Sequence, residues 1–194
     1  RDAGAVFIGR TNTSEFAQAA TTENRFFDDA HNPWDPVKTA GGSSGGAAAS
    51  VSAGLCSIAI GADGGGSIRI PASFTGLFGV KPTFGLCKDE GGLVAMEQFI
   101  SPGPIARCVA DARDICGVLA DKRYIRGRIK KTLRLAFSAR PSNCPHDSKL
   151  VEVFESAVAK LSNLGHQVVG QDILLDGWQD AFGPLVLNTE WRER

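Results

Sequence analysis

Residues 41–76 read GGSSGGAAASVSAGLCSIAIGADGGGSIRIPASFTG. Two glycine-rich loops, each carrying a serine (Ser43 and Ser67), enclose a run of small and apolar residues. A flexible linker would be surrounded by polar, low-complexity sequence, whereas these loops adjoin segments with helix and strand character. Glycine also permits backbone conformations and close approaches that a side chain would block. We therefore predict that both loops are packed inside a folded domain.

The rest of the chain alternates between strand and helix patterns. Apolar residues make up 43% of the 194 residues, which is enough for a core. Continuous or alternating apolar runs predict strands, and apolar residues at helical spacing predict helices. The expected strands are 4–11, 56–63, 132–138 and 166–173, and the expected helices are 45–54, 108–121 and 148–165. Residues 13–40 are expected to be irregular, and 101–107 an extended connection. In the last helix, one apolar face is expected to comprise Leu150, Phe154, Ala157, Val158 and Leu161. This order predicts an α/β fold with a mixed β-sheet core flanked by helices.

Composition excludes several classes of function. The 21 basic and 21 acidic residues balance, so no basic field points to nucleic acid. No apolar run approaches the roughly 20 residues that span a bilayer. The five cysteines lack the C-x-x-C spacing that suggests a zinc site. Free thiols in a reducing compartment, the cytoplasm, are the expectation. Oligomeric state does not follow from the sequence.

The glycine loops have two possible chemistries. Phosphate binding is disfavoured because residues 61–66, GADGGG, match neither common phosphate-loop pattern, and Asp63 would repel a phosphate. Nucleophilic catalysis fits better, because a serine needs a base and the oxyanion it creates needs backbone N–H donors. The donors expected here are those of Gly64, Gly65 and Gly66, directly before Ser67.

The usual catalytic base is not evident. The three histidines, His31, His146 and His166, are scattered along the chain and are expected to be surface or capping residues. The G-x-S-x-G pattern of the α/β-hydrolases is also absent around Ser67, where the sequence is GGSIR. A Ser-His-Asp triad is therefore not predicted.

The whole run from GGSSGG to GVKPT resembles the signature of the amidase signature family of serine hydrolases. The flanking AGAVFIGRTNTSEF, HNPWDP and SPGPIARCVADARDICGVLA segments are similar to the family's as well, so the resemblance covers residues 1 to about 120. It implies a Ser-Ser-Lys site on a mixed α/β sheet, with no metal and no cofactor. Residues 1–194 would then be part of a single amidase signature domain, truncated at both ends.

The resemblance also implies roles for individual residues. Ser67 matches the nucleophile that forms the acyl ester, and Ser43 matches a bridging serine preceded by a cis peptide bond. The N–H groups of residues 64–67 match the oxyanion hole. Asp63 and Arg69 match positions that support the nucleophile loop, although an ordinary loop ion pair describes them equally well.

The family's catalytic lysine lies upstream of the AGAVFIGRTN element and has no counterpart in this chain. Lys38 and Lys81 stand at positions that do not match it. We therefore expect amide hydrolysis to acid and amine, on a small-molecule amide, by the parent enzyme, and little activity from the fragment. The alternative is a catalytically dead truncated paralogue that serves as a binding or scaffold module. The run GGGSIRI, in place of the TGGSIRQ of glutamyl-tRNA amidotransferase subunits, favours a stand-alone amidase.

Overall fold

The structure is a computed structural model that describes residues 2–87, 99–121, 131–141, 146–175, 177, 178 and 180–184. The chain forms two compact units, Arg1–Ile125 together with Thr189–Arg194, and Arg126–Asn188. The first unit carries both glycine loops, and each unit is described by itself. Together they give the mixed α/β architecture that the sequence predicts.

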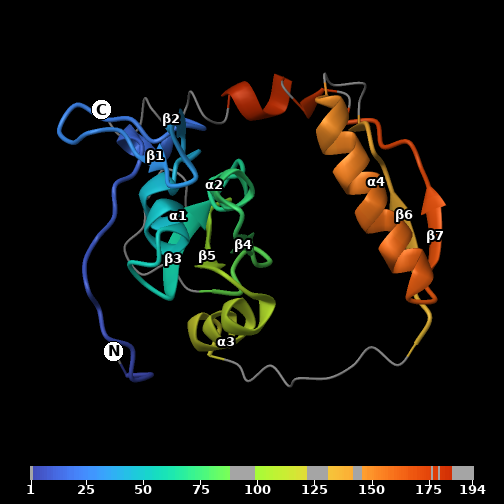
Figure 1. The fold of residues 1–194 in the computed structure, drawn as a ribbon, viewed down its shortest axis with the longest axis horizontal. Helices are drawn as coiled ribbons and strands as arrows, with labels where there is room; N and C mark the ends of the chain where they lie inside the picture. The colour runs from blue at the N-terminus through green and yellow to red at the C-terminus, as the bar shows by residue number, and fades with distance from the viewer. Residues whose placement is uncertain are drawn as a thin grey trace. The chain divides into compact units, whose positions relative to one another are not determined.

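The first unit is built on a three-stranded antiparallel sheet of order β3-β5-β4 (Figure 1). Its strands are β3 (Ile58–Asp63), β5 (Ser101–Ala106) and β4 (Phe78–Gly79). Strand β3 pairs with β5 over its whole length, from Ile58 opposite Ala106 to Asp63 opposite Ser101. This pairing fixes the end of β3, and therefore the start of the second glycine loop, against the sheet.

Three helices accompany this sheet: α1 (Gly45–Ser52), α2 (Arg69–Thr75) and α3 (Val109–Leu119). Helices α1 and α2 lie side by side against the strands, and α3 packs on β5 (Figure 1). Because α1 has almost only small side chains, it can approach its neighbours closely. The core cluster brings together Ala47 and Ala48 of α1, Ile105 of β5 and Ile68. Ile68 is fully buried directly after Ser67, so the core anchors the second glycine loop.

A short hairpin precedes α1. Strands β1 (His31–Asn32) and β2 (Asp35–Thr39) pair antiparallel, and a 3-10 turn, η1 (Glu15–Ala17), lies before them. The expectation of an irregular segment over 13–40 is therefore wrong for 31–39. The hairpin escapes a search for apolar alternation because its short strands, HN and DPVKT, have few apolar residues.

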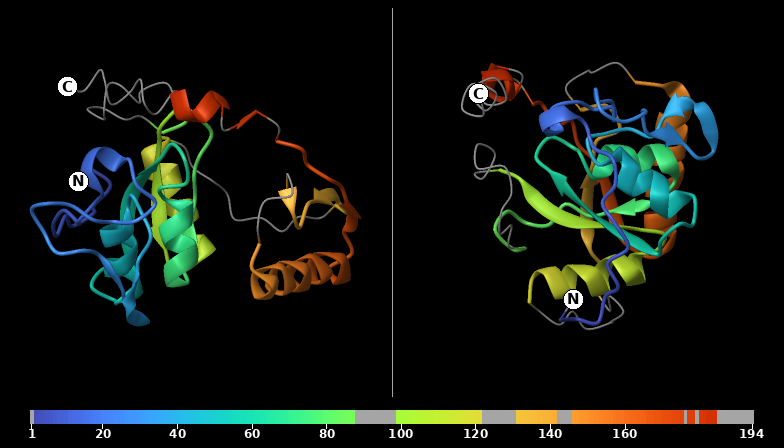
Figure 2. Two further views of the ribbon diagram at one scale, coloured as in Figure 1. Left: turned by 90° about the horizontal axis from the view of Figure 1, so that it is seen from above. Right: turned by 90° about the vertical axis from the view of Figure 1, so that its left-hand side faces the viewer.

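The second unit contains a parallel strand pair with a crossover helix. Strands β6 (Arg134–Phe137) and β7 (Gln167–Gly170) are joined by α4 (Ser148–Asn163), which packs along them (Figure 2). Asp147 begins the helix by accepting the N–H groups of Lys149 and Leu150. All three elements lie where the sequence predicts them.

Three further expectations are wrong. Residues 4–11 form no strand with any described residue, and Phe7 and Ile8 are exposed. The SPGPIA segment is the central strand β5 and not a connection, although Pro102 and Pro104 lack N–H donors; the Pro104 carbonyl accepts from Val80. In α4 the buried residue is Val151, whereas Leu150 is 62% exposed.

Candidate active site

The two glycine loops lie against each other. The N–H of Ser44 donates to the carbonyl oxygen of Ser67 at 3.1 Å, which joins the start of α1 to a residue two positions before α2. A Cβ on Gly41 would lie 2.9 Å from the Cα of Pro71 in α2, and one on Gly61 would lie 2.7 Å from Ser44 Oγ. These contacts leave no space for side chains. The structure therefore brings together two serine-bearing loops that are 24 residues apart in sequence.

The peptide bond between Gly42 and Ser43 is cis, as the sequence resemblance predicts. Ser43 is buried, with 2% of its surface exposed. Its carbonyl oxygen accepts from the hydroxyl of Thr13 at 2.8 Å and from the N–H of Ser14 at 3.3 Å. A Cβ on Gly42 would overlap the carbonyl of Thr21, so glycine is required at this position.

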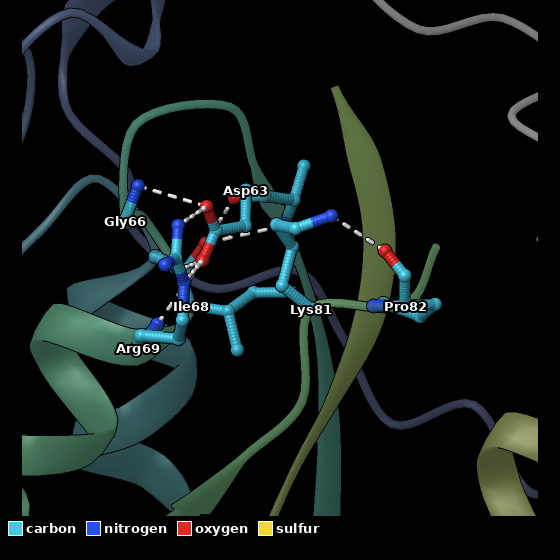
Figure 3. Close-up of polar contacts among 8 residues, drawn as sticks. Asp63, Gly66, Ile68, Arg69, Lys81 and Pro82 are labelled. Atoms are coloured by element: carbon cyan, nitrogen blue, oxygen red, sulfur yellow. Dashed lines mark hydrogen bonds and ion pairs between the residues drawn. The ribbon is translucent and has the colours of Figure 1, made fainter. Parts of the chain in front are cut away.

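Asp63, at the end of β3, holds the second loop (Figure 3). Its carboxylate accepts the N–H of Gly66 at 2.8 Å and the N–H of Ile68 at 3.2 Å. Arg69 donates three times, through its backbone N–H at 3.3 Å, Nε at 2.9 Å and one terminal nitrogen at 2.8 Å. One carboxylate thus fixes both sides of Ser67, and the pair does more than an ordinary surface ion pair.

The charge of Asp63 is stabilised in spite of its burial. Burial alone would raise the pKa of this fully buried carboxyl, and it is the largest single influence. The hydrogen bonds from Arg69, Gly66 and Ile68, with the positive charge of Arg69, outweigh it and hold the pKa below the ordinary value. The same pairing raises the pKa of Arg69, whose side chain remains 55% exposed. Both groups are therefore charged at neutral pH.

The backbone donors before Ser67 are not equivalent. The N–H of Gly66 already donates to Asp63 Oδ1. The N–H groups of Gly65 and Ser67 donate to no described residue. Gly65 is exposed and Ser67 is partly exposed, so both can be reached by a bound molecule. Gly64 lies against Phe99, whose ring a Cβ would meet at 3.0 Å.

The lysines that the sequence singled out have partners other than the two serines. Lys81 Nζ donates to the carbonyl of Pro82 at 2.6 Å (Figure 3), and Lys38 Nζ pairs with Asp35 at 3.3 Å on the surface. His166 accepts the N–H of Leu133 at 3.3 Å in the second unit, which fits the expected structural role. The geometry of the described residues supplies a candidate nucleophile and a candidate bridging serine without assigning a base.

Two further residues of the site were not predicted from the sequence. Ser44 Oγ contacts both backbone polar groups of Ala62, at 3.3 Å from its N–H and 3.5 Å from its carbonyl oxygen. Thr22 is 1% exposed and its hydroxyl contacts the loop around Ser43. The only signal for Thr22 is a threonine in a polar segment, TTENRFF, and periodicity says nothing about such residues.

The chain belongs to the amidase family, because the family model described as Amidase matches residues 1–175. Among curated proteins it is similar to a glutamyl-tRNA(Gln) amidotransferase subunit from Synechococcus sp. (strain RCC307), with 50% identity over 119 residues, 61% of this chain and 24% of the relative. The corresponding protein from Prochlorococcus marinus (strain NATL2A) is 38% identical over 184 residues, 87% of this chain and 38% of the relative.

Solved structures show the same fold. A crystal structure of an amidase superposes with a TM-score of 0.84 and 31% identity, covering 95% of this chain and 42% of that one. A bacterial aryl acylamidase of the amidase signature family gives a TM-score of 0.76 and 30% identity over 92% of this chain and 40% of that one. The chain therefore spans less than half the length of these relatives. No helix in the described part of the chain has the length and apolarity to cross a membrane.

Proposed function

We propose that the protein hydrolyses a carboxylic amide to acid and amine through an acyl ester on Ser67. The hydrogen bond from Ser44 to the Ser67 carbonyl carries this proposal, because it places the two serine loops together at the start of α2. Membership of the amidase family supports the reaction class. A small-molecule amide is the proposed substrate.

In the proposed first half-reaction, Ser67 Oγ attacks the amide carbon, and its proton passes to Ser43 Oγ as the proton of Ser43 moves to a base. The carbonyl oxygen becomes an oxyanion held by the N–H groups of Gly65 and Ser67, with Gly64 adjacent. When the C–N bond breaks, the proton returns through Ser43 to the leaving nitrogen. Water then attacks the ester by the reverse path, which releases the acid and restores Ser67.

Asp63 and Arg69 support the reaction without touching the substrate. Their bonds fix residues 66–69, so the Ser67 hydroxyl and the neighbouring N–H groups keep one arrangement before and during attack. In a site that is preorganised in this way, the donors need not rearrange at the moment of reaction, so no reorganisation energy adds to the barrier.

The base is the remaining component of the proposal. The amidase signature resemblance assigns it to a lysine upstream of the AGAVFIGRTN element. A neutral lysine can accept a proton when its pKa is lowered by burial and by neighbouring donors. We propose that residues 1–194 alone hydrolyse amides slowly and that this lysine completes the site.

Hydrolysis by a stand-alone amidase is favoured over transamidation within a complex. This preference rests on Gly64 and Ile70 in GGGSIRI, since the corresponding residues of the amidotransferase subunits are threonine and glutamine. The side chain of Ile70 lies over both loops: a Cβ on Gly66 would meet it at 2.8 Å and one on Gly41 at 3.3 Å. An apolar wall there suits an apolar amide. Comparing ammonia release from glutamine with hydrolysis of an aryl amide tests this preference, and faster use of glutamine would overturn it.

We also propose a reducing location, the cytoplasm. The four cysteines in the described residues, Cys56, Cys87, Cys108 and Cys116, are free thiols. Burial raises the pKa of the Cys87 and Cys116 thiols, so both are protonated and slow to react at neutral pH. The test isolates the protein from cells under alkylating conditions, which block the free thiols, and then denatures and reduces it. A thiol titration should then find no newly released thiols, because no disulfide was present.

The nucleophile is tested by labelling the protein at its full natural length with a fluorophosphonate and locating the adduct by peptide mass spectrometry. We expect the adduct on Ser67, and Ser67→Ala should abolish labelling and lower turnover by on the order of 10⁵- to 10⁶-fold. Ser43→Ala should lower turnover less, because water can replace part of the relay. An adduct on Ser43 or Ser44 would reverse the roles, and no adduct with no hydrolysis would favour a binding or scaffold module.

A further inference from the structure

Thr22 contacts the loop of residues 41–45, which contains the cis bond before Ser43, and no sequence pattern indicates these contacts. Its hydroxyl donates to the carbonyl oxygen of Gly41 at 2.8 Å and lies 3.2 Å from the carbonyl oxygen of Ser43. The same hydroxyl oxygen accepts the N–H of Gly45 at 3.0 Å. One buried side chain therefore contacts the backbone before, at and after the bridging serine.

These contacts match what a hydroxyl can do. It has one hydrogen to donate and two lone pairs to accept, so donation to Gly41 or Ser43 and acceptance from Gly45 are compatible. Each partner is buried with Thr22, where an unsatisfied backbone group would be costly. The hydroxyl thus provides hydrogen-bond partners for backbone groups of the loop at a place where water is excluded.

Thr22 is itself held in place. Its carbonyl oxygen accepts the N–H of Ala30 at 3.0 Å, and the carbonyl of Ala30 accepts the N–H of Ala40 at 3.0 Å, next to the loop. A Cβ on Gly45 would overlap the Thr22 hydroxyl, so side chain and loop are in direct contact. The loop is therefore clamped to a segment that has its own support.

We propose that Thr22 is a positioning residue for Ser43: it fixes the loop of residues 41–45, from which the Ser43 hydroxyl projects. This inference rests on the proposed function, in which Ser43 passes the proton of Ser67. Thr22 touches no reacting atom in this scheme and acts only through the placement of Ser43. A loop that shifted by about 1 Å would break the proton path, and misplacements of that size cost up to about 10²-fold in rate.

The test uses Thr22→Val and Thr22→Ser in the protein at its full natural length. Valine keeps the shape of threonine and removes the hydroxyl, whereas serine keeps the hydroxyl. We expect Thr22→Val to lower kcat and the rate of fluorophosphonate labelling at Ser67 by about 10- to 100-fold, with little change in KM. Thr22→Ser should stay within about threefold of the natural protein.

A double-mutant cycle separates positioning from general stability. If Thr22 acts through Ser43, then Thr22→Val should cause no further loss of labelling once Ser43→Ala is present. Equal losses in both backgrounds, or a Thr22→Val protein as active as the natural one, would overturn the inference. Should Thr22→Val not fold, Thr22→Cys replaces it, and natural labelling by that variant would overturn the inference equally. Absence of Ser67 labelling in the unmutated protein would instead overturn the proposed function, and this inference with it.

Discussion

At the scale of single residues, Asp63 is the most consequential side chain of the site. It is fully buried, and its five hydrogen bonds all come from residues 66–69. Charge-assisted bonds of this kind are stronger than neutral ones, and the bidentate contact with Arg69 adds directional specificity. The conformation around Ser67 therefore depends on one carboxylate.

We predict that Asp63→Asn destabilises the protein by about 1–3 kcal/mol, because the amide loses the charge and part of the acceptor capacity that the loop uses. Urea denaturation measures this change. Asp35→Asn is the matched control, since Asp35 pairs with Lys38 on the surface and should change stability by less than about 0.5 kcal/mol. Equal effects from both variants would contradict the prediction.

The same residue predicts a pH dependence. The pKa of Asp63 is lowered in the folded state, so its contribution to stability is full above the unfolded pKa of about 4 and is lost as the pH falls through the folded pKa. The urea midpoint of the natural protein should fall more steeply between about pH 5 and pH 2 than that of Asp63→Asn. Parallel pH profiles for the two proteins would show that Asp63 makes no such contribution.

At the scale of elements, α2 is held at both ends. Asp63 binds its beginning, and the β1–β2 hairpin supplies donors to its last carbonyl groups: Asn32 Nδ2 to Phe74 at 2.8 Å and Trp34 Nε1 to Thr75 at 2.8 Å. A helix of seven residues is not stable alone, and its final carbonyls have no partners within the helix. The hairpin, which was not predicted from the sequence, therefore helps to position Ser67.

We predict that Trp34→Phe lowers stability by about 0.5–1.5 kcal/mol, because it removes the indole N–H and leaves an aromatic ring. The change is measured by urea denaturation and by faster amide exchange in α2. Trp178→Phe makes the same substitution in the second unit and should leave exchange in α2 unchanged. Unchanged amide exchange of α2 in Trp34→Phe would show that the β1–β2 hairpin does not hold the end of α2.

The start of α1 also depends on a close approach between Gly46 and the backbone of Asn12. A Cβ on Gly46 would lie 2.6 Å from the backbone nitrogen of Asn12, so the helix and the segment before η1 are in contact through a bare α-carbon. Gly46→Ala should destabilise by about 1–3 kcal/mol through this overlap, although alanine favours a helix by about 1 kcal/mol. Thermal or urea denaturation of the variant measures the effect.

Gly9→Ala provides the control for that substitution. A Cβ on Gly9 would meet nothing within 4 Å, so this change should alter stability by less than about 0.5 kcal/mol. If Gly46→Ala proved as mild as Gly9→Ala, the segment before η1 would not constrain α1 in solution.

At the scale of the whole molecule, the two serine loops form one assembly, but the proposed reaction needs a base as well. We predict that residues 1–194 alone hydrolyse an aryl amide several orders of magnitude more slowly than a version extended upstream through the family's lysine segment, because loss of the base costs about 10³- to 10⁶-fold. Equal and substantial rates would contradict the lysine assignment. Lys81→Ala would then be the next variant to assay.

The amino-acid sequence alone was sufficient to predict the helices α1, α3 and α4 and the strands β3, β6 and β7. Their apolar spacing and terminal glycines, such as Gly54 and Gly165, which both take positive φ values, are local signals. The family resemblance predicted the paired serines and the cis bond before Ser43, because the motif GGSSGG…GGGSIR is distinctive. The proposed catalytic roles of Ser43 and Ser67 stay predictions.

Only the tertiary structure decided which of these segments meet. The expected strand at residues 4–11 has no partner among the described residues, and SPGPIA became a central strand because β3 and β4 pair with both its edges. The use of Gly66 as a donor to Asp63, and of Thr22 as a clamp on residues 41–45, also depends on contacts that periodicity does not report. Periodicity indicates which side of an element is apolar, but hydrogen bonds between loops depend on where the packed elements place them.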